Sequence, residues 1–227
     1  MIAYRKAYHA YQEHHKAYGI NIPRILKQDL LLFSRQLGLN EEYERYRQRF
    51  EVEARALDRE QGELVILFHK DLAPIKRSQR IAQVDPGTGY LVHFALPVYE
   101  PRNSHLSHAR VVVAGQRVPT EPMEDITAIA LRTLQKNMPA ITARALARAV
   151  VKHQMSRQAG ENNGLAGLLM NIAGVVSEQA DTRSWLTLPA EIQMARVTLP
   201  PGDYNVSLEL IEIGGQVTHN RQLGQVN

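Results

Sequence analysis

Hydrophobic positions in the first 60 residues recur at spacings of three and four, which is the period of an amphipathic helix. The pattern predicts helices over residues 2–18 and 24–37, and a third that begins at Asn40 and carries its apolar stripe to Leu57. Gly19 and Gly38 stand where glycine commonly ends a helix. Pro23 stands at the start of the second helix, where proline is tolerated. The first quarter of the chain is therefore expected to be helical.

From Gly62 onward the period shortens to that of β-strands. Strands are predicted at residues 63–68, 80–84, 90–94, 110–113, 190–199, 203–213 and 216–222. Pro201-Gly202 and Gly214-Gly215 are typical of the turns that join the last three. Between the two groups of strands, a block from about 122 to 180 follows the helical period, in segments 123–137, 139–157 and 164–179.

These elements predict the α+β class. A helical hairpin over residues 1–60, which looks like the remnant of a tetratricopeptide array, precedes an α+β domain over 61–227. We expect a β-sandwich-like layer made of strands at about 62–118 and 184–222, with the helices of about 122–180 inserted between them. An ordinary helical hairpin explains the N-terminal pattern equally well, because no second repeat is visible and arrays need about three.

Composition narrows the class of protein. With 44% hydrophobic residues in 227, the chain has enough apolar residues for a core. The absence of cysteine excludes disulfides, thiol chemistry and a lipidated N-terminal cysteine in this sequence. The net charge of +4 is modest, so specific nucleic-acid binding is not expected. No signal peptide and no apolar run long enough for a membrane span are visible, so we expect a soluble chain.

The most basic stretch contains no acidic residue from position 131 to 157. Arg144, Arg148 and Lys152 recur every four residues and therefore share one helical face. This face could bind phosphate, anionic lipid or an acidic partner. The simpler interpretation is a solvated face opposite an apolar stripe made by Ile141, Ala145, Leu146, Ala149 and Val150.

Catalytic motifs are not found in the sequence. There is no Gly-x-Ser-x-Gly elbow, no phosphate-binding glycine loop and no His-Glu-x-x-His metal motif. The nine histidines lack the compact spacing of a metal site, so neither metal nor cofactor is expected. A further apolar stripe consists of Leu165, Leu168, Leu169, Ile172, Val175 and Val176. We interpret it as the buried face of a helix packed closely under the sheet.

The only tryptophan, Trp185, follows an Asp181/Arg183 pair and precedes Pro189. We expect the ion pair to anchor the chain as it leaves the helical block, and Trp185 to be buried at that junction. Pro189 restricts the residue before it to extended backbone and so favours the start of a strand. The pattern predicts a structural role for this segment rather than a ligand-stacking tryptophan.

The chain resembles an uncharacterised family of bacterial envelope proteins, typically lipoproteins with N-terminal tetratricopeptide-like repeats. The resemblance covers nearly the whole chain, and its most specific part is Asp181-Thr-Arg183-Ser-Trp185-Leu-Thr-Leu-Pro189. The other matching segments are residues 3–8, 62–65, 72–76, 123–128 and 141–148, together with Lys152. The sequence departs from the family in lacking a signal peptide, a lipidation cysteine and most repeats, so we expect an N-terminally truncated product.

The resemblance implies a periplasmic or outer-membrane-associated protein that acts by interaction and carries no catalytic residues. We therefore expect a non-enzymatic interaction or structural module that binds another envelope protein or a cell-wall component, with an accessory role in cell-wall assembly by analogy. The alternative is a small-molecule or glycan-binding domain, including a hydrolytic one. An exposed Trp185 or a cleft with convergent carboxylates would favour that alternative.

Overall fold

The computed structural model describes residues 1–55, 60–84, 91–102, 104–162 and 179–227, and the chain divides into two compact units. The first unit comprises Met1–Ala73, Asn103–Ile129 and Thr187–Asn227, and the second comprises Pro74–Arg102 and Ala130–Leu186. Helices and antiparallel sheets are present in the order predicted, so the α+β class is confirmed.

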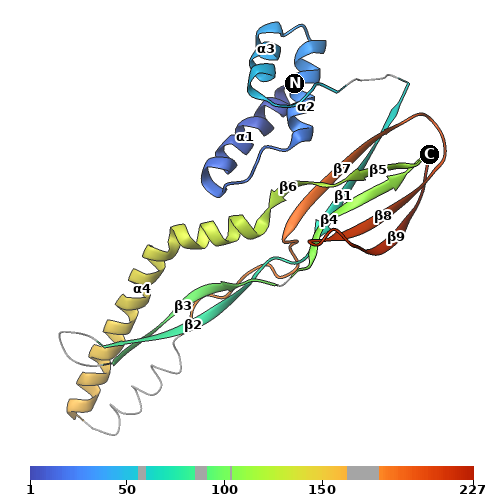
Figure 1. Ribbon diagram of the computed structural model, residues 1–227. Coiled ribbons are helices and arrows are strands. Elements are labelled where there is room, and N and C mark those ends of the chain that lie inside the picture. The colour runs from blue at the N-terminus through green and yellow to red at the C-terminus, as the bar shows by residue number, and fades with distance from the viewer. Residues whose placement is uncertain (56–59, 85–90, 103, 163–178) are drawn as a thin grey trace. The chain divides into compact units, whose positions relative to one another are not determined.

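Three helices open the first unit: α1 (Ile2–Tyr18), α2 (Arg24–Gln36) and α3 (Asn40–Arg49) (Figure 1). Leu30 and Leu31 of α2 are fully buried, and the ring of Tyr8 meets the rings of Tyr46 and Phe50 edge to face. The first two helices match their predicted ranges. The third is shorter than predicted because Phe50 takes an extended conformation, and Leu57 lies outside the described residues.

Two antiparallel sheets form the β layer of the first unit (Figure 1). One has the order β1 (Gly62–Lys70), β7 (Glu191–Leu199), β6 (Glu121–Asp125). The other has the order β5 (Gln116–Pro119), β4 (Leu106–Val113), β8 (Tyr204–Glu212), β9 (Val217–Val226).

The two sheets share one hydrophobic core. Alternate residues of β7 and of β4 are buried, as expected for strands that turn one face inward. The core comprises Ala109, Val111, Val113, Ala195, Val197, Leu199, Val206 and Leu208. Because residues of both sheets fill the same core, the predicted β-sandwich-like layer is confirmed.

A buried ion pair joins the helices to the β layer within the first unit. The carboxylate of Asp29 in α2 is 1% exposed and accepts two hydrogen bonds from Arg196 of β7, at 2.7 and 2.9 Å. Arg55 donates a third at 3.0 Å and also pairs with Glu63. The hydrogen bonds from Arg196 to Asp29 raise the pKa of Arg196 above its ordinary value, although burial acts in the opposite direction.

The second unit contains an antiparallel pair, β2 (Ile75–Val84) and β3 (Leu91–Glu100), and the long helix α4 (Ile126–Asn162) from residue 130 onward (Figure 1). Ala145 and Ala149 of α4 are buried against Phe94 of β3, with Ile81 and Leu96 packed around them. The small alanine side chains allow the helix backbone to come close to the strands, and this contact fixes which faces of α4 remain outside.

The helical block differs from its prediction at both ends. Residues 122–125, predicted as its start, belong to β6 because they pair with β7 through a bulge near Pro122. Asp125 then caps the helix, with its Oδ1 accepting a hydrogen bond from the Ala128 N–H at 2.8 Å. Helix α4 continues through Pro139 rather than breaking into two segments. The predicted helix at 164–179, with the stripe from Leu165 to Val176, lies outside the described residues except for its last position.

Candidate functional site

A cavity of about 890 Å³ lies within the second unit. Strand β2 contributes Lys76, β3 contributes Ala95 and Pro97, and the remaining residues come from α4 and from the segment that follows residue 178. Helix α4 contributes Asn137, Ile141, Arg144, Ala147 and Arg148, and the segment contributes Ala180 and Asp181. Its volume falls within the range of pockets that hold small molecules.

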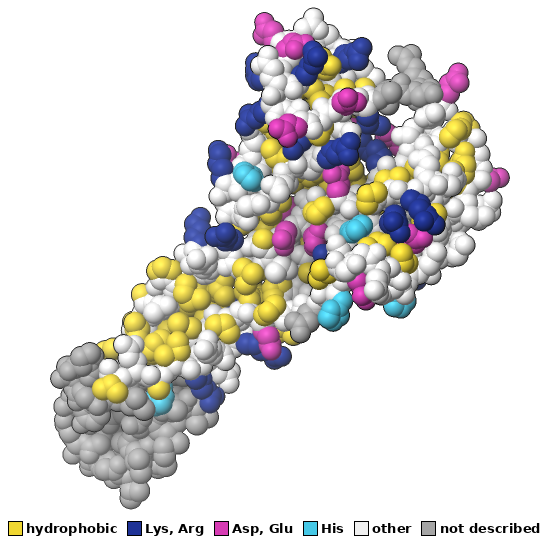
Figure 2. All heavy atoms as spheres, viewed as in Figure 1, with side chains coloured by type: hydrophobic (Ala, Val, Ile, Leu, Met, Phe, Trp, Pro, Cys, Tyr) yellow, Lys and Arg dark blue, Asp and Glu magenta, His cyan; other side chains and the backbone are white. Residues whose placement is uncertain are grey.

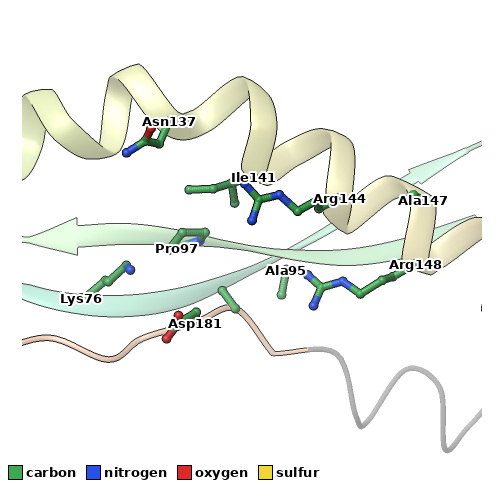
Figure 3. A pocket seen from close by; sticks show the side chains of 10 residues that line it. Lys76, Ala95, Pro97, Asn137, Ile141, Arg144, Ala147, Arg148 and Asp181 are labelled. Atoms are coloured by element: carbon green, nitrogen blue, oxygen red, sulfur yellow. The ribbon is translucent and has the colours of Figure 1, made fainter.

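Arg144 and Arg148 extend from α4 toward the strands of this cavity (Figure 3). They are one helical turn apart, so their Cα atoms are separated by about 6 Å along the axis. The packing of Ala145 and Ala149 on Phe94 holds the helix in the rotation that places both arginines at the cavity. Within the part of the chain that the structure describes, neither guanidinium has an ion-pair partner.

Asp181 is the carboxylate of the cavity wall, and its charge is already compensated. Arg183 donates to both of its oxygens, Nε to Oδ1 at 3.0 Å and Nη2 to Oδ2 at 2.9 Å, and the Arg183 backbone N–H donates to Oδ1 at 3.1 Å. These hydrogen bonds hold the pKa of Asp181 well below its usual range, with a smaller contribution from the charge of Lys76. They raise the pKa of Arg183 in turn.

The segment that carries Asp181 is attached to the strand that carries Lys76. The backbone N–H of Ala180 donates to the hydroxyl of Ser78 at 3.0 Å, and Ser78 lies two residues after Lys76 on β2. Figure 3 shows Lys76 on β2 and Asp181 on the segment that runs next to this strand. The cavity wall therefore holds three cationic side chains and one carboxylate that Arg183 neutralises.

A second feature of α4 is an exposed stripe, which we name the docking stripe: Arg132, Lys136, Pro139, Ala143, Leu146 and Val150. The spacings of four and three residues place all six on one face of the helix. Each is exposed, and the two largest apolar members, Leu146 and Val150, are 38% and 49% exposed. Figure 2 shows hydrophobic side chains gathered over α4.

The three residues of the predicted basic face, Arg144, Arg148 and Lys152, have different surroundings in the structure. Arg144 and Arg148 line the cavity, whereas Lys152, on the same helix, is half-buried and is not part of the cavity wall. The expected apolar stripe is also divided, because Ala145 and Ala149 are buried while Leu146 and Val150 face outward. The basic face thus borders a cavity, which its spacing alone could not indicate.

Trp185 is not buried as predicted, since 72% of its surface is exposed. The Asp181/Arg183 ion pair forms, but it is itself exposed and does not enclose the ring. Pro189, in the first unit, is half-buried, and β7 begins two residues after it. The sequence suggested burial because tryptophan is the largest apolar side chain, yet most of its surface is exposed.

Lys76 and Asn137 were missed at the sequence level. Lys76 lies on β2, a strand with many polar residues, and Asn137 is one of many polar residues on α4. Their presence in one cavity wall with Arg144 depends on the packing of α4 on β3. No local motif marks either residue.

The chain was also compared with known proteins. No protein-family model, curated protein or solved structure matches it. Among the described residues, no helix is both long and apolar enough to cross a membrane. The same part of the chain contains no group of three or more histidine and acidic residues suited to hold a metal ion.

Proposed function

We propose that this protein is a non-catalytic interaction module of the bacterial cell envelope, and that the docking stripe of α4 binds an acidic amphipathic helix of a partner protein. The single observation that supports this function is the exposure of Leu146 and Val150 in line with two cations on one helical face. The envelope location rests on the resemblance of the sequence, and an accessory role in cell-wall assembly is part of the same proposal.

The shape of the stripe fits a helical partner. Its residues recur at alternating spacings of four and three, as do the contact positions of two helices packed along one another. From Arg132 to Val150 the stripe spans about 27 Å at 1.5 Å per residue. A partner helix of about five turns would cover it with side chains at positions i, i+3, i+4 and i+7.

The charge of the stripe favours an acidic partner. Arg132 and Lys136 occupy its first turns, and no acidic residue occurs from position 131 to 157 to neutralise them within the helix. Carboxylates beside the apolar residues of a partner would complement these cations and would disfavour basic helices. The partner is thus an amphipathic helix whose apolar stripe is flanked by Asp and Glu.

Site-specific photo-crosslinking tests this function. Ala143 is replaced by a photoreactive phenylalanine analogue, and the full chain is irradiated in a bacterial envelope extract. We expect one discrete adduct whose crosslinked peptide belongs to an acidic amphipathic helix. The double variant Leu146→Glu, Val150→Glu should abolish this adduct, because it places like charges against the partner's carboxylates.

The control carries one glutamate at another exposed apolar residue, Leu37→Glu, which is 58% exposed and lies in the first unit. This variant should keep the adduct, and circular dichroism should show that all variants are folded. Failure to form a discrete adduct, or an adduct that persists in the double variant, would refute docking at this stripe. An adduct that forms in a cytosolic extract but not in the envelope extract would refute the envelope part of the proposal.

A further inference from the structure

We propose that the cavity of the second unit binds an anionic small molecule through Arg144, Arg148 and Lys76. The anionic group is a phosphate or carboxylate, and the uncharged part of the ligand lies against Ala95, Pro97 and Ile141. This site uses a different face of α4 from the docking stripe, so anion binding in the cavity does not depend on the proposed partner.

The excess of positive charge is the first observation that supports the site. The cavity wall carries Lys76, Arg144 and Arg148, and its carboxylate, Asp181, is held by Arg183. Clustered cations in a partly enclosed cavity raise the local concentration of anions, because the field is screened less there than on an open surface. An anion entering the cavity would supply the partner that the two arginines lack among the described residues.

The geometry of the donors is the second observation. Guanidinium groups bind carboxylate and phosphate oxygens through paired N–H donors, which gives both affinity and orientation. Arg144 and Arg148 approach from the helix, whereas Lys76 approaches from β2, so the donors come from two elements rather than one surface (Figure 3). The amide of Asn137 is a further polar group of the cavity wall.

The rest of the wall selects for a small organic ligand over a bare ion. Ala95, Pro97, Ile141 and Ala147 present apolar surface within the same cavity. About 890 Å³ is far larger than one phosphate requires and is typical of pockets for small organic molecules. A ligand with an anionic head and an apolar or sugar-like body satisfies both parts of the wall.

Calorimetric titration of the full chain tests this site with two probes, inorganic pyrophosphate and citrate. We expect saturable binding of one molecule per chain, and the tighter probe distinguishes phosphate from carboxylate recognition. The double variant Arg144→Gln, Arg148→Gln should weaken that binding at least tenfold. Lys76→Gln, on β2, should weaken that binding severalfold. A loss from this strand would show that the effect does not come from a local change in the structure of α4.

The matched control is Arg132→Gln with Lys136→Gln, which removes the same charge from exposed positions of the same helix outside the cavity. This control should change the affinity less than twofold, and circular dichroism should show an unchanged helix content. If both double variants lost the same affinity for the probe, binding would depend on the overall positive charge of the helix rather than on a specific site, and the proposal would be overturned. Binding of neither probe at millimolar concentration would overturn it as well.

Discussion

At the scale of single residues, Asp29 shows how a charge can be retained in a protein interior. Its carboxylate is 1% exposed and accepts three hydrogen bonds from two arginines, so the cost of removing it from water is offset by close, directional partners. The pair connects Asp29 of α2 with Arg196 of β7, and these two residues are 167 positions apart in the chain. Such a contact contributes to the placement of the helices on the β layer within the first unit.

Replacing Asp29 by Asn should destabilise the first unit by about 3 kcal/mol, because Arg196 would stay largely buried without a countercharge and Arg55 would keep only Glu63. Urea denaturation followed by circular dichroism measures the change. The control Glu13→Gln removes an exposed ion pair with Lys16 and should leave the midpoint unchanged. Equal midpoints for the Asp29 variant and the native chain would show that the buried pair contributes little.

Trp185 illustrates the limit of reasoning from residue type. A single tryptophan beside an ion pair and a proline suggested a buried junction, yet its ring is 72% exposed. Burial depends on which surfaces the tertiary fold brings to a side chain, and the size of the side chain does not supply them. An exposed Trp185 is the feature that, from the sequence, would favour the alternative of a small-molecule or glycan-binding domain.

At the scale of elements, α4 combines three faces with different surroundings. Ala145 and Ala149 pack on Phe94, Arg144 and Arg148 face the cavity, and Leu146 and Val150 face outward. The helix continues through Pro139, although a proline in a helix interior lacks the N–H donor and its ring crowds the carbonyl four residues earlier. Packing on β3 stabilises the helix against this local penalty.

Replacing Pro139 by Ala should raise the stability of the second unit by about 1–3 kcal/mol, because the Gln135 carbonyl regains a donor and the exposed proline ring contributes no core packing. Thermal unfolding followed by the helical circular dichroism signal measures this change. As a control, Ala140→Gly at the neighbouring exposed position should lower the midpoint. A midpoint that falls in the Pro139 variant would show that the proline stabilises the native helix.

At the scale of the whole molecule, the described residues of the two compact units form buried clusters of different size. The described part of the second unit has a cluster of three buried residues, Phe94, Ala145 and Ala149, whereas the first has two clusters of eight and six. Because burial of apolar surface is the main stabilising contribution, we predict that the second unit is the less stable of the two. Ligand or partner binding to α4 would then stabilise the weaker unit.

Hydrogen exchange measured by mass spectrometry should therefore show faster exchange in β2 and β3 than in β4 and β8. Because β4 and β8 are central strands of a four-stranded sheet and β2 and β3 form a two-stranded one, the comparison is made only between amides hydrogen-bonded within each antiparallel pair. Pyrophosphate at a saturating concentration should slow exchange in β2, β3 and α4 while leaving β4 and β8 unchanged. Equal protection of the two strand pairs in the free chain would contradict the ranking of the units.

The sequence by itself determined the local elements: the first two helices, most strands and the α+β class follow from hydrophobic periodicity and from turn residues such as Gly19 and Gly38. Only the tertiary structure decided that residues 121–125 join a sheet and that Lys76 and Arg144 line one cavity. Periodicity reports which face of an element is apolar, whereas long-range packing decides what meets that face. Strand pairing and a cavity wall both depend on residues distant in the chain, so no local pattern encodes them.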